Sequence, residues 1–98
     1  MSKRVSAITL TCPPHIHWVK DSGQILVVNE KKGAARILRG FEAAVWDYLM
    51  LGYSFPRLTA TLGMLLDIPA REMEQKLAAC LRNWQAGGLL EAGEASHV

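Results

Sequence analysis

Long apolar runs are missing from this sequence. The longer ones, such as 62–66, fall far short of the ~20 residues that a helix needs to cross a bilayer, so no membrane span is predicted. Charge of one sign is also scarce: 11 basic and 9 acidic residues leave a net charge of +2, well below the basic excess of a dedicated nucleic-acid-binding domain. Cysteine is limited to Cys12 and Cys80, which indicates free thiols in a cytoplasmic protein rather than a disulfide framework.

Recognisable catalytic motifs are scarce as well. No glycine-rich phosphate loop precedes a helical pattern; Gly87-Gly88 follows one, which is typical of a helix C-terminus. Glu72 and Glu74 stand two residues apart on a predicted helix, so their carboxylates do not face each other. Glu72 is instead expected to pair with Lys76, four residues on, along a solvated face. We therefore predict no catalytic residues, no enzyme activity and no cofactor.

Side chains with metal-binding chemistry gather in one short segment. Alternation along a strand puts His15 and His17 on the same face, close in sequence to Cys12. A fourth ligand is missing unless His97 returns from the tail, and structural zinc sites usually have paired, tighter spacings. The favoured interpretation is two polar histidines on an exposed strand face, and no metal site is predicted.

Residues 15–38 have the pattern of a β-meander. Half of the 98 residues are hydrophobic, which is enough for one domain with a modest core. Strands are expected over 15–20, 24–30 and 34–38, separated by two turns that contain glycine. The continuous run of apolar residues over 25–28 predicts that the middle strand is covered on both faces.

Three amphipathic helices are predicted to follow. The first covers 41–51 and stops at Gly52, the second starts at Ser54 as N-cap and runs to 66, and the third begins at Pro69 and ends at Gly87-Gly88. The expected core residues on the second and third helices are Leu58, Leu62, Leu65, Leu66, Met73, Leu77, Cys80, Leu81 and Trp84, with Trp46 on the first. The order predicts an α+β fold: a three-stranded antiparallel meander followed by three helices, in a winged-helix-like arrangement that excludes βαβ nucleotide-binding folds.

The two ends of the chain are expected to lie outside this domain. Residues 1–13 form an N-terminal arm, which Pro13-Pro14 separates from a domain over 14–90. Residues 91–98 are predicted to be a flexible tail. Because the arm carries a weak strand pattern, it is a candidate for pairing with a second copy and so for making a homodimer.

The basic residues raise a nucleic-acid alternative. Lys31, Lys32, Arg36 and Arg39 cluster on the hairpin, and Arg71, Lys76 and Arg82 lie on the third helix, as a wing and a recognition helix would require. The acidic Glu72 and Glu74 in the first turn of that helix argue against this arrangement. A winged-helix DNA-binding module for transcription regulation is therefore the second hypothesis, and a structural domain that only docks to an enzyme subunit is the third. Solvated surface charge explains the basic residues most simply.

The third strand, Ala34–Leu38, is expected at an edge of the sheet. Arg36 and Arg39 are the kind of charge that protects an edge against aggregation. The functional alternative is a docking edge, where an extended peptide adds a strand through main-chain hydrogen bonds. Proline in place of Arg36 is then expected to block the pairing by removing the Arg36 N–H.

Over 14–90 the chain resembles the PqqD family, the small peptide-binding proteins of pyrroloquinoline-quinone biosynthesis, also called precursor-peptide recognition elements. The similarity rests on the meander, on LRGFEAAVWDYLMLG over 38–52, on Ser54 and Leu58 at the start of the next helix, and on LRNWQAGGLL over 81–90. It covers most of the chain, although no single motif is chemically diagnostic. The sequence departs from the family in the third strand, where AARIL replaces an aromatic-rich segment and Arg39 stands where the family often has Asn.

This resemblance implies a non-enzymatic peptide chaperone. It would bind the leader of a ribosomally made precursor peptide as a strand added to Ala34–Leu38, in a groove beside the third helix, and present it to a radical SAM enzyme of the SPASM type. The implied site residues are Lys32, Ala34, Ala35, Arg36, Ile37, Leu38, Met73, Lys76, Leu77, Leu81 and Trp84. Part of the third-helix stripe would then face the groove. The basic residues Lys32, Arg36 and Lys76 would attract an acidic leader in a salt-dependent way.

Overall fold

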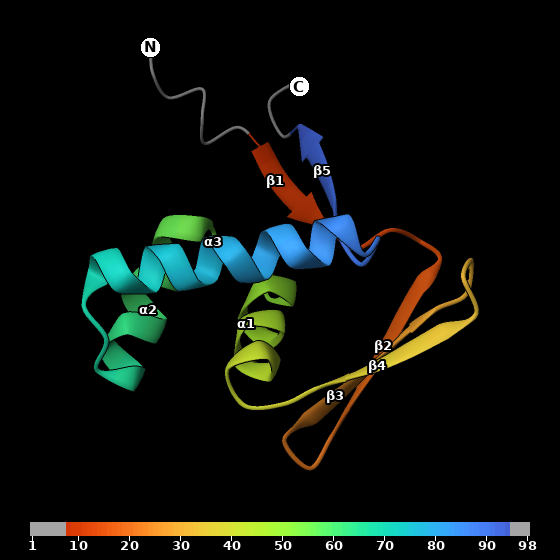
Figure 1. The fold of residues 1–98 in the computed structure, drawn as a ribbon, viewed down its shortest axis with the longest axis horizontal. Helices are drawn as coiled ribbons and strands as arrows, with labels where there is room; N and C mark the ends of the chain where they lie inside the picture. Colours follow the sequence, from red (N-terminus) through yellow and green to blue (C-terminus); the bar gives the residue numbers. More distant parts are fainter. Residues whose placement is uncertain (1–7, 95–98) are drawn as a thin grey trace.

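The computed structural model describes residues 8–94, and its elements follow the predicted order with a short strand added at each end (Figure 1). They are β1 (Ile8–Thr11), β2 (Ile16–Asp21), β3 (Gln24–Asn29), β4 (Ala34–Leu38), α1 (Phe41–Met50), α2 (Phe55–Leu66), α3 (Ala70–Ala86) and β5 (Glu91–Glu94). The predicted α+β class is confirmed, because a three-stranded antiparallel meander precedes three helices. Within this part of the chain, no helix combines the length and the apolar character that a membrane span requires.

The main sheet has the strand order β2-β3-β4 and only one covered face. Ile25 and Val27 of β3 are each 1% exposed, whereas Leu26 between them is 38% exposed. The predicted cover on both faces of β3 is therefore wrong. Antiparallel sheets commonly keep one face on the core and one in solvent, and a short apolar run does not reveal which arrangement applies.

Two tight turns set the geometry of this sheet. Ser22 and Gly23 both have positive φ, 51° and 79°, in the turn between β2 and β3. In the turn before β4, the buried Asn29 accepts a hydrogen bond from the Lys32 N–H through its Oδ1 at 3.1 Å, and Gly33 adopts φ 66°. The asparagine thus holds the second turn from inside and fixes where β4 begins.

The helix ends follow local sequence signals. The Ser54 hydroxyl accepts a hydrogen bond from the Arg57 N–H at 3.3 Å, as an N-cap should, and Gly52 has φ 98° just beyond α1. At the other end of α2, Asp67 takes the left-handed conformation with φ 57°. The predicted start of α2 and the stop after α1 are both confirmed.

The apolar stripe of α2 is only half buried. Leu58 and Leu62 belong to the core, but Leu65 is 62% exposed and Leu66 46% exposed, so their predicted core role is wrong. Both lie in the last turn of α2, beyond the cover that the neighbouring helices give to its earlier turns. Helical spacing identifies a face of a helix, and it does not say how far along the helix that face stays covered.

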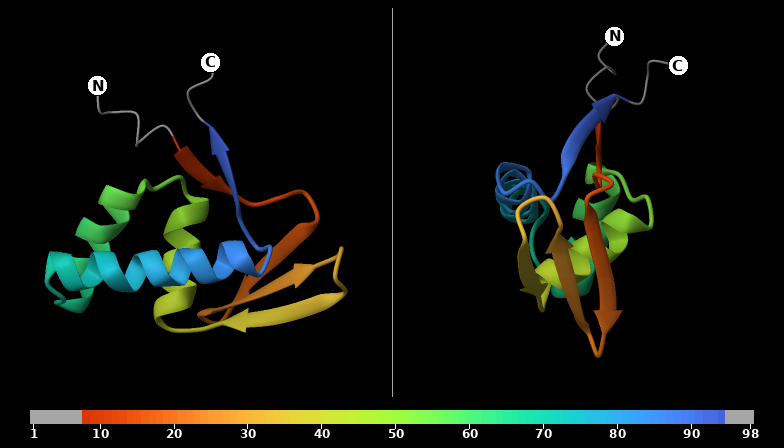
Figure 2. Two further views of the ribbon diagram at one scale, coloured as in Figure 1. Left: turned by 45° about the horizontal axis from the view of Figure 1, so that its top comes forward. Right: turned by 90° about the vertical axis from the view of Figure 1, so that its right-hand side faces the viewer.

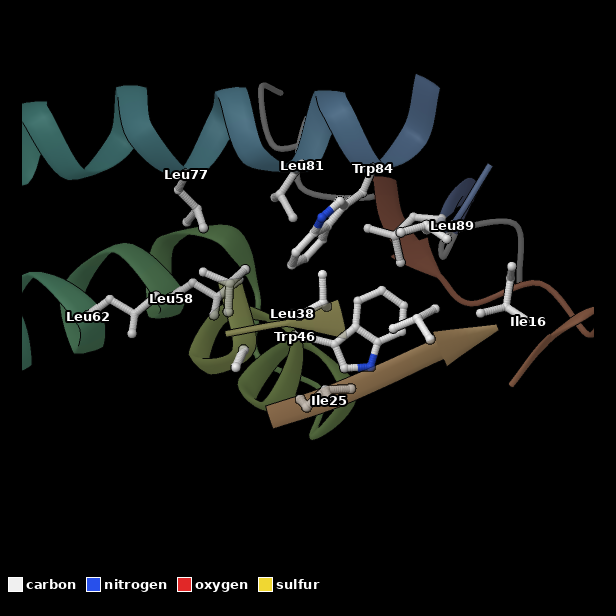
Figure 3. Close-up of a cluster of buried hydrophobic side chains, with 14 of the residues drawn as sticks. Ile16, Ile25, Leu38, Trp46, Leu58, Leu62, Leu77, Leu81, Trp84 and Leu89 are labelled. Atoms are coloured by element: carbon white, nitrogen blue, oxygen red, sulfur yellow. The ribbon is translucent and has the colours of Figure 1, made fainter. Parts of the chain in front are cut away.

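The core lies between the covered face of the sheet and the three helices (Figure 3). Trp46 of α1 and Trp84 of α3 are completely buried, with ring centroids 5.3 Å apart and ring planes at 74°. This edge-to-face contact is the favoured geometry for aromatic pairs, and it confirms the predicted core role of both residues. Neither indole N–H has a hydrogen-bond partner, so the large apolar area that the rings bury must outweigh two unsatisfied donors.

The two added strands tie the ends of the described chain together. β1 pairs antiparallel with β5, with Ile8 opposite Glu94 and Thr11 opposite Glu91. The described part of the N-terminal arm therefore pairs within its own chain, and the segment Glu91–Glu94 is a strand rather than the flexible tail that was expected. Residues 1–7 and 95–98 lie outside the described part, and with them the remainder of the predicted arm and tail.

Candidate functional site

β4 lies at the edge of the main sheet and runs beside α3. Among the described strands β4 pairs with β3 alone, and the right-hand view of Figure 2 shows that it is the strand nearest α3, with β2 on the far side. An unpaired strand edge presents a row of N–H and C=O groups to solvent. The sheet has two such edges, on β2 and on β4, and the edge of β4 is the one that offers main-chain hydrogen bonds to an extended segment beside α3.

The hydrogen bonds around Asn29 show which backbone groups of β3 point toward β4. The Glu30 N–H donates to the His15 carbonyl at 2.9 Å, toward the β2 side. The next group back along the chain, the Asn29 carbonyl, accepts from the Gly33 N–H at 2.9 Å, toward the β4 side. Because these directions alternate along an antiparallel strand, Ile25, Val27 and Asn29 bond toward β4.

The register then identifies the outward-facing groups of β4. Arg36 lies opposite Val27, so its backbone N–H and C=O point inward to β3. The backbone groups of Ala35 and Ile37, on either side of Arg36, point to the free edge. The expectation that the Arg36 N–H serves the edge is therefore corrected: proline at this position removes a bond inside the sheet, and the test position moves to Ile37.

Side chains of β4 alternate between the two faces of the sheet. Leu38 is buried on the covered face, and Ala34 and Arg36 share that face with it. Ala35 and Ile37 lie on the solvent face, where Ile37 is 50% exposed. An added strand would therefore meet two environments: an open apolar surface on one side, and the space between β4 and α3 on the other.

Arg36 links β4 to the helices. Its Nη2 donates to Glu42 Oε2 of α1 at 3.4 Å, and both terminal nitrogens lie 3.5 Å from Asn83 Oδ1 of α3. These contacts are long for charge-assisted hydrogen bonds, which cluster near 2.7–2.9 Å. The guanidinium therefore lies between β4 and α3 without a short hydrogen bond to either neighbour.

The apolar stripe of α3 does not face this space. Met73, Leu77 and Trp84 are completely buried and Leu81 is 7% exposed. The expectation that part of the stripe faces the groove is therefore corrected, because the sheet, α1 and α2 need this stripe to close the core. These four residues hold α3 on the core, and Figure 3 shows Leu77, Leu81 and Trp84 pointing from α3 into it.

A second row of residues flanks the stripe and borders the groove: Lys76, Cys80 and Asn83 on α3, and Gly87 at its C-cap. Lys76 is exposed and places its Nζ 5.0 Å from the centre of the Phe41 ring. Among the described residues it forms no ion pair with Glu72, so the predicted Glu72–Lys76 pair is replaced by a cation–π contact.

The site residues predicted from the sequence include neither Asn83 nor Gly87, and Cys80 was predicted to lie in the core. Lys76, Cys80, Asn83 and Gly87 are separated by four, three and four residues in turn, which puts them on one helix face, and that spacing was the available signal.

A shallow pocket opens where the end of α3 meets the β3–β4 hairpin. Its lining residues are Val27, Asn29, Lys32, Ala34, Ala35, Arg36, Gly87 and Leu89. Four of the predicted site residues, Lys32, Ala34, Ala35 and Arg36, are thus brought together here, and the small alanines leave the space open. The pocket is walled by apolar groups and rimmed by basic ones.

Cys80 borders the groove as a half-buried thiol with an unusual acidity. The pKa of Cys80 is raised to about 11, mainly by burial and also by the nearby Glu42 carboxylate, while Arg36 acts in the opposite direction. Burial also raises the pKa of Cys12. Both thiols should therefore stay protonated at neutral pH.

We expect Cys80 to react slowly with a disulfide reagent. At pH 8, a pKa shift from about 9 to about 11 lowers the thiolate fraction about a hundredfold, and the greater nucleophilicity of a more basic thiolate restores roughly tenfold. In a Cys12→Ser variant, dithiobis(nitrobenzoate) should thus label Cys80 at least about tenfold more slowly in the native protein than in urea. Glu42→Gln should speed the native reaction. Equal rates in native and unfolded protein would contradict the burial of this thiol.

The predicted histidine face shows no metal-binding geometry. His17 Nε2 lies 3.3 Å from Glu30 Oε1 on the exposed face, and the Cys12 thiol lies 3.9 Å from the Ile16 carbonyl. Among the residues whose side chains the structure describes, no three His, Cys, Asp or Glu side chains converge as ligands. His97 lies outside the described residues.

This arrangement, a meander whose edge strand runs beside the last helix, is shared by two solved structures. One solved structure that shares it is TbiB1 in complex with the TbiA(β) leader peptide, with a TM-score of 0.79, 15% sequence identity, and coverage of 83% of this chain and 94% of that chain. A second is a lasso peptide synthetase B1 complexed with the leader peptide, with a TM-score of 0.73, 14% identity, and coverage of 84% and 96%.

The likeness lies in the fold and not in the sequence. No protein-family model matches this sequence, and no curated protein sequence matches it significantly. The predicted fold, a three-stranded meander followed by three helices, is confirmed, because both solved structures share it.

Proposed function

We propose that this chain is a non-enzymatic peptide-binding protein that takes the leader of a ribosomally made precursor peptide as an added strand on β4. The observation that carries the proposal is the edge of β4 beside α3, which no described strand covers, in a fold shared with two proteins solved with leader peptides. A cytoplasmic location, where ribosomal precursors are made, is part of the proposal.

In this proposal the main-chain bonds come from Ala35 and Ile37, whose backbone groups point to the free edge. Such bonds give affinity for any extended chain, and the neighbouring side chains give specificity. Lys76, Cys80 and Asn83 on α3 would border the docked strand, with Arg36 between the two walls. The buried residues Met73, Leu77, Leu81 and Trp84 would contribute by holding α3 in place.

The bound leader would be passed to a modifying enzyme. The PqqD resemblance makes a radical SAM enzyme of the SPASM type the first candidate. A lasso peptide synthetase system is the second candidate, because both similar structures hold leader peptides and one is itself a lasso peptide synthetase subunit. Affinity capture with each class of enzyme, with and without a bound leader, would separate the two.

The DNA-binding alternative receives less support. α3 exposes Glu72 and Glu74 in its first two turns, where a recognition helix would approach phosphates. A fluorescence titration with random-sequence duplex at 50 mM salt tests this alternative directly, since phosphate-driven binding is strongest at low salt.

The experiment that tests the proposal is amide chemical-shift mapping with a bound peptide. Suitable probes are 12-residue peptides selected from a displayed random library for binding to the whole chain. We expect the largest amide shifts at Ala35, Ile37 and the α3 flank, with little change along β2. Shifts centred on another surface would contradict β4 docking.

A further inference from the structure

Basic side chains follow the space between β4 and α3 from one end to the other. Lys32 borders the pocket at the hairpin end, Arg36 stands in the middle, and Lys76 lies over the Phe41 ring at the other end. Glu42 contacts this row through Arg36, and Glu72 lies one helical turn before Lys76 on the exposed face of α3. Three cations thus border a space that contains one contacting carboxylate.

Arg36 is held only loosely by its present partners. Its contacts with Glu42 and Asn83, at 3.4 and 3.5 Å, are long, and both carboxylate and guanidinium are part-exposed. Exposed ion pairs of this kind contribute little to stability. A guanidinium has five N–H donors in a fixed fork that matches a carboxylate, so it can accept a second anionic partner without giving up the first.

The pocket beside Arg36 has side-chain donors on its lining. The Asn29 Oδ1 is occupied by the Lys32 N–H, which leaves the amide nitrogen of Asn29 on the pocket side. The last carbonyls of α3 are also occupied, because those of Asn83, Trp84 and Gln85 accept from the N–H groups of Gly87, Leu89 and Gly88. An anion entering here meets donors, and the negative end of the helix is largely capped.

The position that would carry the anion follows from strand geometry. Residues directly opposite each other in paired strands share a face. A docked residue opposite Arg36 therefore points into the space between β4 and α3, next to the guanidinium, while its sequence neighbours point to the solvent face near Ile37.

We propose that the groove reads an acidic side chain, Asp or Glu, at the docked-strand position opposite Arg36. This inference rests on the proposed function and deepens it by naming the chemistry of one leader position. Arg36 binds the carboxylate and Lys32 supports it from the pocket. General attraction by the surface charge would favour acidic peptides wherever their acidic residues lie. The proposed site instead requires an acidic residue at one position of the docked strand.

The test uses displayed random 12-residue peptides selected on the full chain. Edge binders are defined as those that lose binding to an Ile37→Pro variant. Among them we expect Asp or Glu to be enriched several-fold at one aligned position, and replacement of that residue by Asn or Gln to weaken binding about tenfold. Lys at that position should restore binding to an Arg36→Glu variant, which a structural role of Arg36 would not produce.

Each outcome has a separate meaning. Edge binders without an acidic position, or a charge swap that restores nothing, overturn this inference and leave the proposed function standing. A library that yields no edge binders overturns the proposed function itself. If Arg36→Glu disturbs the fold, as circular dichroism would reveal, Arg36→Gln takes its place: the acidic preference should then disappear while edge binding persists, and a retained preference rejects the assignment.

Discussion

Replacing Ile37 with proline should weaken peptide binding about tenfold or more while the fold survives. The Ile37 N–H points to the free edge of β4, so proline removes a donor that the sheet itself does not use. The lost hydrogen bond, together with the ring that blocks close approach of a second strand, should cost at least about 1.4 kcal/mol of binding free energy. Isothermal titration with a library-selected edge peptide measures the effect.

Two neighbouring substitutions serve as controls for this prediction. Ile37→Ala removes the same half-exposed side chain and keeps the N–H, so its affinity should stay within about threefold of wild type. Arg36→Pro should instead destabilise the protein, because the Arg36 N–H bonds inward to β3. A folded Ile37→Pro variant that binds as tightly as wild type would rule out strand addition at β4.

Leu77→Ala should lower the free energy of unfolding by about 2–5 kcal/mol. Leu77 is completely buried on the α3 stripe, where truncation removes apolar contacts and leaves a cavity. A domain of this size has a total stability of roughly 5–15 kcal/mol, so the loss would be a large share of it. Urea unfolding followed by the fluorescence of the buried Trp46 and Trp84 provides the measurement.

The matched control is Leu65→Ala, the same change on a residue that is mostly exposed. It should alter stability by no more than about 0.5 kcal/mol. If Leu77 faced a groove, the two variants would unfold alike and only Leu77→Ala would weaken peptide binding. Under the arrangement described above, the folded fraction of Leu77→Ala retains its affinity for an edge peptide.

Local signals in the sequence were sufficient wherever the structure is decided locally. The hydroxyl of Ser54, the left-handed Gly52 and the turn at Gly33 act within a few residues of themselves, so the ends of α1, α2 and β4 were predictable. Whether a side chain is covered by an element distant in sequence cannot be predicted from such local signals. Leu26 and Leu65 were assigned to buried faces because their neighbours are apolar, and only the packed molecule reveals that both stay partly exposed.

The site was predictable as an edge but not in its orientation. Which β4 groups point outward depends on the register with β3, and that register is fixed by the Asn29-centred turn. A shift of one residue would exchange the roles of Arg36 and Ile37. The pairing of β1 with β5 joins residues about eighty positions apart, and weak strand patterns in two short segments do not identify each other.

The ribbon of β1 and β5 makes the two ends of the described chain geometrically equivalent. Ile8 and Glu94 are opposite each other, so a linker attached at either end starts from the same place relative to β4 (Figure 1). A peptide tethered through a long flexible linker should therefore experience a similar effective concentration at the edge from either end. Single-chain versions that carry their own ligand can be built in both orders, and a circular permutant joined across the ribbon should keep the β4 edge intact.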